Sequence, residues 1–426
     1  MNEIDRRTLL LGSAGLVLAG CSGGSEPEKP KGPNIVKPRT GNVVRPADTA
    51  ELRDRLNQAF KSHDVDQLVK IIDPEDFAIE DVRARWTRRF DNFDRLNFID
   101  GEWYVGLPGG RTRNASGGAV EYDGDLVFAH TVAGCDAQQV VESYSASFRK
   151  KSKDAPLELL HLGDAEASFD PSIWDVAKVD MIETKHAWIV FREKDAAKAR
   201  ANASRIEAGA ARAFDLMPRP KGVNKIFYAL TWPAVDGKLY GGVAVGDALA
   251  HAYYHPFLDP KVLSTGQRKP TGAKGLPKAT GRVGLHESSF KQGDIDQTAC
   301  HEAIHVLANQ WYVAGDLPTW IAEGLATWGE FGPRLKAERG RMRPAFAQFE
   351  KVVPKGYKEF HDSSLEYEFY LSSAAMFAAI EERDGRDGVF KVAQAFYGSE
   401  TRQEAVKKIG RTEKQLVADA RKWVGA

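Results

Sequence analysis

Residues 301–305 of this 426-residue chain read His-Glu-Ala-Ile-His, and residues 320–326 read Trp-Ile-Ala-Glu-Gly-Leu-Ala. Residues four apart on an α-helix lie about 40° apart around the helix axis. His301 and His305 therefore present their imidazoles to one point, as two ligands of one metal ion must. The first stretch thus predicts a metal-binding helix, and the second predicts a helix that can reach the same point.

Glutamates on both predicted helices could reach the point where the two imidazoles converge. Glu302 lies next to the histidine face and can reach a metal-bound water. Glu323 can supply a third ligand, and three protein ligands leave the fourth position of Zn²⁺ open for water or substrate. Glu330 competes for that place, because it follows on nearly the same helical face. We favour Glu323, near the helix start, and predict Zn²⁺ as the cofactor, held by His301, His305 and Glu323.

The sequence around the motif indicates a helix packed in a core. A surface helix carrying two histidines and a glutamate would be the alternative, because short motifs also occur by chance. Apolar residues recur at helical spacing at Ile295, Ala299, Ala303 and Val306, which favours a buried helix. Pro318 is a typical start for the helix that carries Glu323. We therefore expect a buried site between two helices.

The pair of motifs resembles that of the gluzincins, zinc peptidases with two His on one helix and a Glu on the next. The segment 320–326 is similar to the corresponding segment of aminopeptidase N-like enzymes. The resemblance is strongest over residues 281–331 and extends more weakly over about 172–426. It implies a mixed sheet lobe, a zinc-binding helix and a helical C-terminal lobe. The implied activity is hydrolysis of peptide bonds in a peptide or protein substrate by a metal-activated water, with Glu302 as general base.

The chain departs from the families that it resembles in two segments, and these departures limit the activity that the resemblance implies. The Gly-x-Met-Glu-Asn segment that anchors a substrate's free amine in the aminopeptidases is absent, so exopeptidase activity is not implied. The thermolysin-like branch has an Asp four positions after the ligand Glu, where this chain has Thr327. Gluzincins commonly use a Tyr or His of the helical lobe as the oxyanion donor, and the family pattern selects Tyr370 over Tyr367. The competing interpretation of Tyr370 is a core aromatic with a satisfied hydroxyl.

The first residues have the pattern of an export signal. Arg6-Arg7 precede an apolar run from Leu9 to Ala19, which is too short to span a bilayer as a stable helix. Residues 1–20 are therefore expected to be a signal peptide, exported by the Sec or the twin-arginine route. Leu18-Ala19-Gly20-Cys21 resembles a bacterial lipobox, which implies lipidation of Cys21. Residues 21–47 would then be a flexible linker to the lipid anchor of an extracytoplasmic, membrane-attached protein.

Composition excludes some other classes of protein. The formal net charge is zero and the pI is about 7.2, so there is no electrostatic footprint for nucleic acid. After the signal, no segment is apolar for eighteen residues, so we expect anchoring rather than spanning. Cys135 and Cys300 fall in different predicted domains, which argues against a scaffold built on disulfides. The oligomeric state stays open.

The rest of the chain divides into two predicted domains of α+β class. Residues 48–168 show helical spacing and then alternating segments at 126–132, 140–149 and 157–162, which predicts helices followed by an antiparallel sheet. This order resembles the ketosteroid-isomerase-like cone fold, a likeness that assigns no chemistry. Residues 172–426 would form the gluzincin-like domain. The rival function is a membrane-anchored binding or scaffolding lipoprotein that retains a zinc site without peptidase activity.

Periodicity also places the elements of the second predicted domain. Strands are expected at 187–192, 225–230 and 282–286, with an edge strand at 243–247 and a helix at 196–214. Further helices are expected at 344–352, 365–383, 388–397, 402–409 and 412–424. Four other histidines are predicted not to bind metal, namely His251, His255, His286 and His361.

Overall fold

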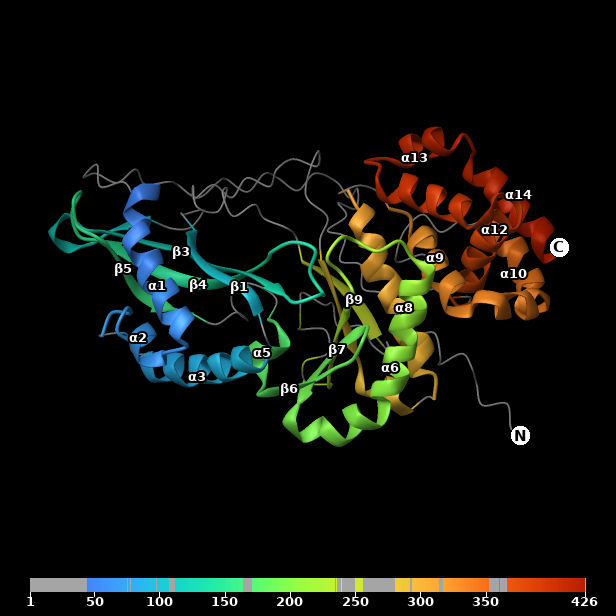
Figure 1. The fold of residues 1–426 in the computed structure, drawn as a ribbon. Helices are drawn as coiled ribbons and strands as arrows, with labels where there is room; N and C mark the ends of the chain where they lie inside the picture. The colour runs from blue at the N-terminus through green and yellow to red at the C-terminus, as the bar shows by residue number, and fades with distance from the viewer. Residues whose placement is uncertain are drawn as a thin grey trace.

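The computed structural model contains two five-stranded sheets and a helical lobe, and its class is mixed α+β (Figure 1). It describes residues 44–425 except 75, 77, 97, 107–111, 164–170, 234, 236–238, 240–249, 256–279, 292, 314–316, 352–359 and 361–365. The predicted signal, Cys21 and most of the linker lie outside these residues. We call residues 44–163 the first unit and residues 171–425 the second unit.

The first unit consists of helices followed by an antiparallel sheet, as predicted. Its helices are α1 (Ala50–Ser62), α2 (Val65–Val69) and α3 (Ile79–Arg95), with 3-10 turns η2 (Pro46–Thr49) and η3 (Ser116–Gly118). Its strands are β1 (Phe98–Gly106), β2 (Thr112–Asn114), β3 (Val120–Val132), β4 (Val140–Lys150) and β5 (Leu157–Leu162). The sheet order is β1-β3-β4-β5, and β2 pairs with β3. Sequence periodicity missed β1 and β2 and began β3 six residues late.

Aromatic packing holds the helices of the first unit on the sheet. In α3, Val82, Trp86, Phe90 and Phe93 are buried at helical spacing and face the strands. The Phe60 ring of α1 lies 4.8 Å from the ring of Phe128 in β3. Large aromatic rings in contact remove much apolar surface from water, so this cluster is a main source of the unit's stability.

The second sheet has the order β6-β7-β8-β10-β9. Its strands are β6 (Val179–Glu183), β7 (Ala187–Arg192), β8 (Ile226–Leu230), β9 (Ala250–His255) and β10 (Thr280–Leu285). The central strands β7, β8 and β10 are parallel, and β6 and β9 are antiparallel strands at the two edges. The three central strands and α6 (Ala196–Leu216) confirm the expected elements to within two residues. The edge strand expected at 243–247 lies outside the described residues, and the described edge is β9.

The remaining described elements are mostly helical. They are α5 (Ile173–Val176), η4 (Glu193–Asp195), η6 (Glu287–Lys291), α8 (Ile295–Ala308), η7 (Asn309–Trp311), α9 (Thr319–Phe331), η8 (Gly332–Glu338), α10 (Arg339–Lys351), α12 (Glu366–Tyr397), α13 (Arg402–Ile409) and α14 (Glu413–Val424). The helices expected at 365–383 and 388–397 are joined in α12 through Gly385, whose φ of 72° suits a residue without Cβ. The helix expected from 344 begins five residues earlier, and Pro344 lies inside it.

The two units share a buried core. One face of the second sheet packs with α6 and α8, and residues of its other face cluster with the first unit (Figure 1). Trp174 of α5 meets His130 of β3 edge to face, with ring centroids 5.6 Å apart, and meets Phe227 of β8 in the same way at 5.9 Å. Arg282 of β10 and Asp136, between β3 and β4, form a fully buried ion pair, with Nη2 2.7 Å from Oδ2. The second sheet is thus covered on both faces only when both units are present.

Within the described part of the chain, no helix is both long enough and apolar enough to cross a membrane.

Candidate metal centre

The three predicted ligands meet in one buried group. His301 and His305 come from α8, and Glu323 comes from the first turns of α9. One potential ligand atom from each side chain lies within 4.8 Å of the other two, and all three residues are buried. In the part of the chain that the structure describes, this is the one group of three or more such residues arranged to hold a metal ion.

The distances between these atoms fit a tetrahedral metal ion. The Nε2 atoms of the two histidines are 3.2 Å apart, and Oε2 of Glu323 lies 3.3 Å from His301 Nε2 and 3.5 Å from His305 Nε2. Ligand atoms at zinc-like bond lengths of about 2.0–2.1 Å in a tetrahedron are separated by roughly 3.3 Å. Three atoms at this spacing, converging from two helices, can therefore hold a cation of this size at their centre.

The electrostatics of the three side chains also favour a cation. Burial opposes ionisation of Glu323, but the two imidazoles outweigh it and hold the pKa of its carboxyl far below the usual range. Burial likewise opposes a charge on His301, yet hydrogen bonds to Glu323 and Glu330 raise its pKa well above the usual value. Burial lowers the pKa of His305, which keeps this ring in the neutral form that binds metals. Carboxylates that hold a proton on His301 would attract a metal ion in the same way.

Glu330, the competing ligand, takes a different place. Its Oε2 lies 2.9 Å from Nδ1 of His301, on the ring nitrogen that points away from Glu323. A carboxylate at that nitrogen fixes the tautomer and orientation of a metal-binding histidine. From the sequence, Glu330 could be considered only as a competing ligand. The sequence shows the helix face on which Glu330 lies, but not which nitrogen of His301 its carboxylate contacts.

Glu302 lies beside the group, also from α8. Its side chain is 1% exposed, and burial raises the pKa of its carboxyl to about 8 against the opposing effect of His301. The backbone N–H of Ala252 in β9 donates a hydrogen bond to this carboxyl. The edge strand of the second sheet therefore runs past the acidic group, a contact that the sequence did not predict.

Of the two tyrosines at the start of α12, Tyr370 lies next to the metal-ligand group. Tyr370 is fully buried, and its ring centroid lies 6.1 Å from that of His301 and 5.0 Å from that of Phe360. Tyr367 is half-buried, and burial raises the pKa of its hydroxyl against the lowering effect of its hydrogen bond to Arg341. The two hydroxyls thus have different surroundings although the residues are three apart.

The helix that carries Glu323 approaches α12 very closely. A Cβ on Gly324 would lie 2.8 Å from the backbone of Ser373, closer than real Cβ atoms come to other atoms. The glycine after the ligand therefore sets the distance between α9 and α12, and with it the position of Glu323 relative to Tyr370.

The other candidate residues lie outside this group. His251 and His286 are buried and contact each other, with His286 Nε2 2.6 Å from His251 Nδ1. The side chains of His255 and His361 are outside the described residues. Cys135 and Cys300 are buried and form no disulfide, and Arg212 Nε donates to the Cys300 sulfur at 3.2 Å. Cys300 thus belongs to the packing of α8 rather than to the ligand set.

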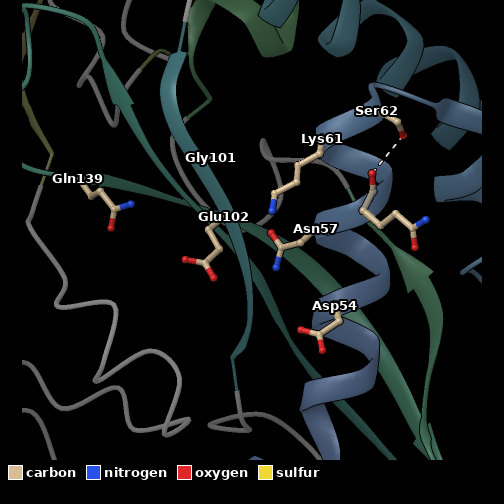
Figure 2. A pocket seen from close by; sticks show the side chains of 8 residues that line it. Asp54, Asn57, Lys61, Ser62, Gly101, Glu102 and Gln139 are labelled. Carbon is tan, nitrogen blue, oxygen red and sulfur yellow. Dashed lines mark hydrogen bonds between the residues drawn. The ribbon is translucent and has the colours of Figure 1, made fainter.

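A hollow of about 830 Å³ lies in the first unit, between α1 and β1 (Figure 2). Most of the residues that line it have polar side chains, Lys61 and Glu102 among them. The side-chain amide of Asn57 accepts from Trp103 N at 2.8 Å and donates to Trp103 O at 3.3 Å. This pairing covers backbone groups at the open edge of β1, which otherwise could pair with another strand. The hollow contains none of the metal-ligand group.

No family model matches the chain, and no curated protein matches it in sequence.

Proposed function

We propose that this chain is a zinc-dependent peptidase that hydrolyses peptide bonds in a peptide or protein substrate. The observation that supports it best is the buried convergence of His301, His305 and Glu323, with the acidic Glu302 beside them on the same helix. Two nitrogens and one oxygen from three protein ligands are a typical donor set of catalytic zinc. When bound, Zn²⁺ would lower the pKa of a coordinated water to about 7 and polarise the scissile carbonyl.

The side chains around the group can perform the proton transfers of amide hydrolysis. Glu302 would accept a proton from the attacking water and deliver it to the leaving amine, because a carboxyl beside the ligand group is a base when ionised and an acid when protonated. Tyr370, packed beside His301, would donate a hydrogen bond to the oxygen that gains negative charge. The β9 edge next to Glu302 would pair with extended substrate backbone.

A comparison of the wild-type chain with Glu302→Gln tests this function. Both proteins should contain one zinc per chain by elemental analysis, because glutamine leaves the three ligands in place. Only the wild type should cleave a peptide library followed by mass spectrometry. Cleavage by neither protein at full zinc content would instead support the rival, a binding or scaffolding lipoprotein that retains the metal site.

The proposed location is extracytoplasmic, with a lipid anchor at Cys21 and the described units outside the membrane. The support is the apolar run and lipobox-like segment before Cys21. A Cys21→Ser variant should escape lipidation and move from the membrane fraction to the soluble fraction. Several acyl chains are needed for a durable anchor, so loss of the modified residue should release most of the protein. Uncleaved wild-type protein in the cytoplasm would contradict this proposal.

A further inference from the structure

A buried polar network lies where the chain leaves the first unit for the second. Residues 171–178 form this connection, which includes α5 and leads directly into β6. Glu142 of β4 and Asp175 of α5 are 6% and 3% exposed. The titratable or charged groups that face these two residues are His130 of β3, Tyr144 of β4, and Arg88 and Arg89 of α3.

Glu142 binds the connection through both of its oxygens. Ser172 Oγ donates to Oε1 at 2.5 Å, and Trp174 Nε1 donates to Oε2 at 3.3 Å. His130 Nε2 lies 3.8 Å from Oε1, beyond hydrogen-bond distance. One side chain of the first sheet therefore holds two residues of the segment that leads to the second sheet.

Asp175 holds the same connection through an ion pair. Arg89 Nε donates to Oδ1 at 2.6 Å, and the backbone N–H of Ser172 donates to Oδ2 at 2.9 Å. Arg88 also donates to the backbone carbonyl of Asp175. Because the guanidinium is always charged, Asp175 is the carboxyl of this network whose negative charge is matched.

The hydroxyl of Tyr144 has one proton for two carboxyls. It lies 3.1 Å from Glu142 Oε2 and 3.2 Å from Asp175 Oδ1. One O–H can donate to only one of them. If it donates to Asp175, the contact with Glu142 is a hydrogen bond only when Glu142 itself carries a proton. An ionised Glu142 would instead be a second buried negative charge facing oxygen lone pairs.

We propose that Glu142 holds a proton in the folded chain, and that its ionisation loosens the attachment of residues 171–178 to the first unit. The order of donors is then Glu142 to Tyr144 and Tyr144 to Asp175. When Glu142 loses its proton, its contact with the Tyr144 oxygen becomes repulsive. The connection between the two sheets thereby becomes sensitive to alkaline pH.

The direction of the pH effect follows from the burial of Glu142. Burial raises the pKa of this carboxyl to about 8, and the charge of Asp175 adds to the increase against the hydrogen bonds that Ser172 and Trp174 donate. The folded-state pKa is thus above the ordinary value of 4.5. The stabilisation of the folded chain by protonated Glu142 is therefore complete below the ordinary pKa of 4.5 and is lost as the pH rises through about 8. Between these values the unfolding constant should increase by about tenfold per pH unit.

Infrared spectroscopy of the full chain tests where the proton is. Measurements use ¹³C-glutamate labelling in a Glu302→Gln background, because burial also raises the pKa of Glu302. At pH 6 we expect the C=O band of a protonated glutamic acid, which disappears at alkaline pH and is removed by Glu142→Gln. Absence of that band overturns the proposal, even if Glu142→Gln does not fold. Loss of an imidazolium signal from His130 over the same pH range would also overturn it.

Unfolding in urea and hydrogen exchange test the consequence. Glutamine can donate to Tyr144 but cannot ionise, so Glu142→Gln should retain its urea midpoint from pH 6 to pH 9 better than wild type. Exchange of residues 172–179, corrected for intrinsic rates, should accelerate at pH 9 in wild type alone. Glu102→Gln is the matched control, because Tyr104 Oη donates to the exposed Glu102 at 2.6 Å on β1. Equal pH dependence in wild type and Glu142→Gln would overturn the proposal.

Discussion

Oε2 of Glu330 lies 2.9 Å from Nδ1 of His301, while Nε2 of the same ring faces Glu323. The two glutamates, on one helix, thus contact opposite nitrogens of one imidazole. In a metal-bound site they would have different parts, with Glu323 in contact with the ion and Glu330 orienting the His301 ligand.

Replacing Glu330 should weaken metal binding without removing the site. Loss of such an outer carboxylate typically lowers affinity about 10–100-fold. We therefore expect Glu330→Gln to bind one zinc with lower affinity in competition with a chelating dye, whereas Glu323→Ala should lose the metal at the same chelator concentration. Retention of zinc by Glu323→Ala together with its loss in Glu330→Gln would show that Glu330 is the ligand.

Removing the Tyr370 hydroxyl should affect turnover rather than metal content. If this hydroxyl stabilises the oxyanion, Tyr370→Phe should lower kcat by roughly a hundredfold or more. Zinc content and KM should stay near the wild-type values, because the ring is retained beside His301. Tyr367→Phe is the control, since its hydroxyl contacts Arg341. A large loss in Tyr367→Phe with unchanged turnover in Tyr370→Phe would reverse the assignment.

A methyl group on Gly324 should separate α9 from α12. The added Cβ would clash with the Ser373 backbone, and overpacking of this kind costs about 1–3 kcal/mol. We expect Gly324→Ala to lower the free energy of unfolding in urea by this amount and to weaken zinc binding through Glu323. Gly340→Ala is the control, because Gly340 lies in α10 with no atom within 4 Å of an added Cβ. Equal stability of the two variants would contradict the close approach.

Deletion of the first unit should make the second unit insoluble. Residues 171–425 alone would expose Trp188 and Phe227, which are 1% exposed in the full chain, and would leave Arg282 without Asp136. An unpaired buried charge and an uncovered sheet face both destabilise strongly. Expression and size-exclusion chromatography of residues 171–426 provide the measurement. A soluble monomer with native-like circular dichroism would show that the shared core is dispensable.

Local periodicity was sufficient to predict much of the helical structure and the strands β7, β8 and β10. The elements that it missed depend on partners far away in the chain. Strand β1, for example, is completed by β3 on one side and by Asn57 on the other. The bend at Gly385 has a local cause. It joins the two predicted helices, because a single residue with positive φ can continue a helix in a new direction.

The sequence by itself determined that His301 and His305 share a helix face with Glu302 beside them, because this follows from the 3.6-residue period alone. It favoured Glu323 over Glu330 only because Glu323 is nearer the helix start, since both lie on nearly the same face of α9. The crossing of α9 over α8 places the two glutamates differently, by bringing one carboxylate to each nitrogen of His301. The approach of β9 to Glu302 and the pairing of Arg282 with Asp136 were also decided only by tertiary packing, since these groups lie 50 or more residues apart in the chain.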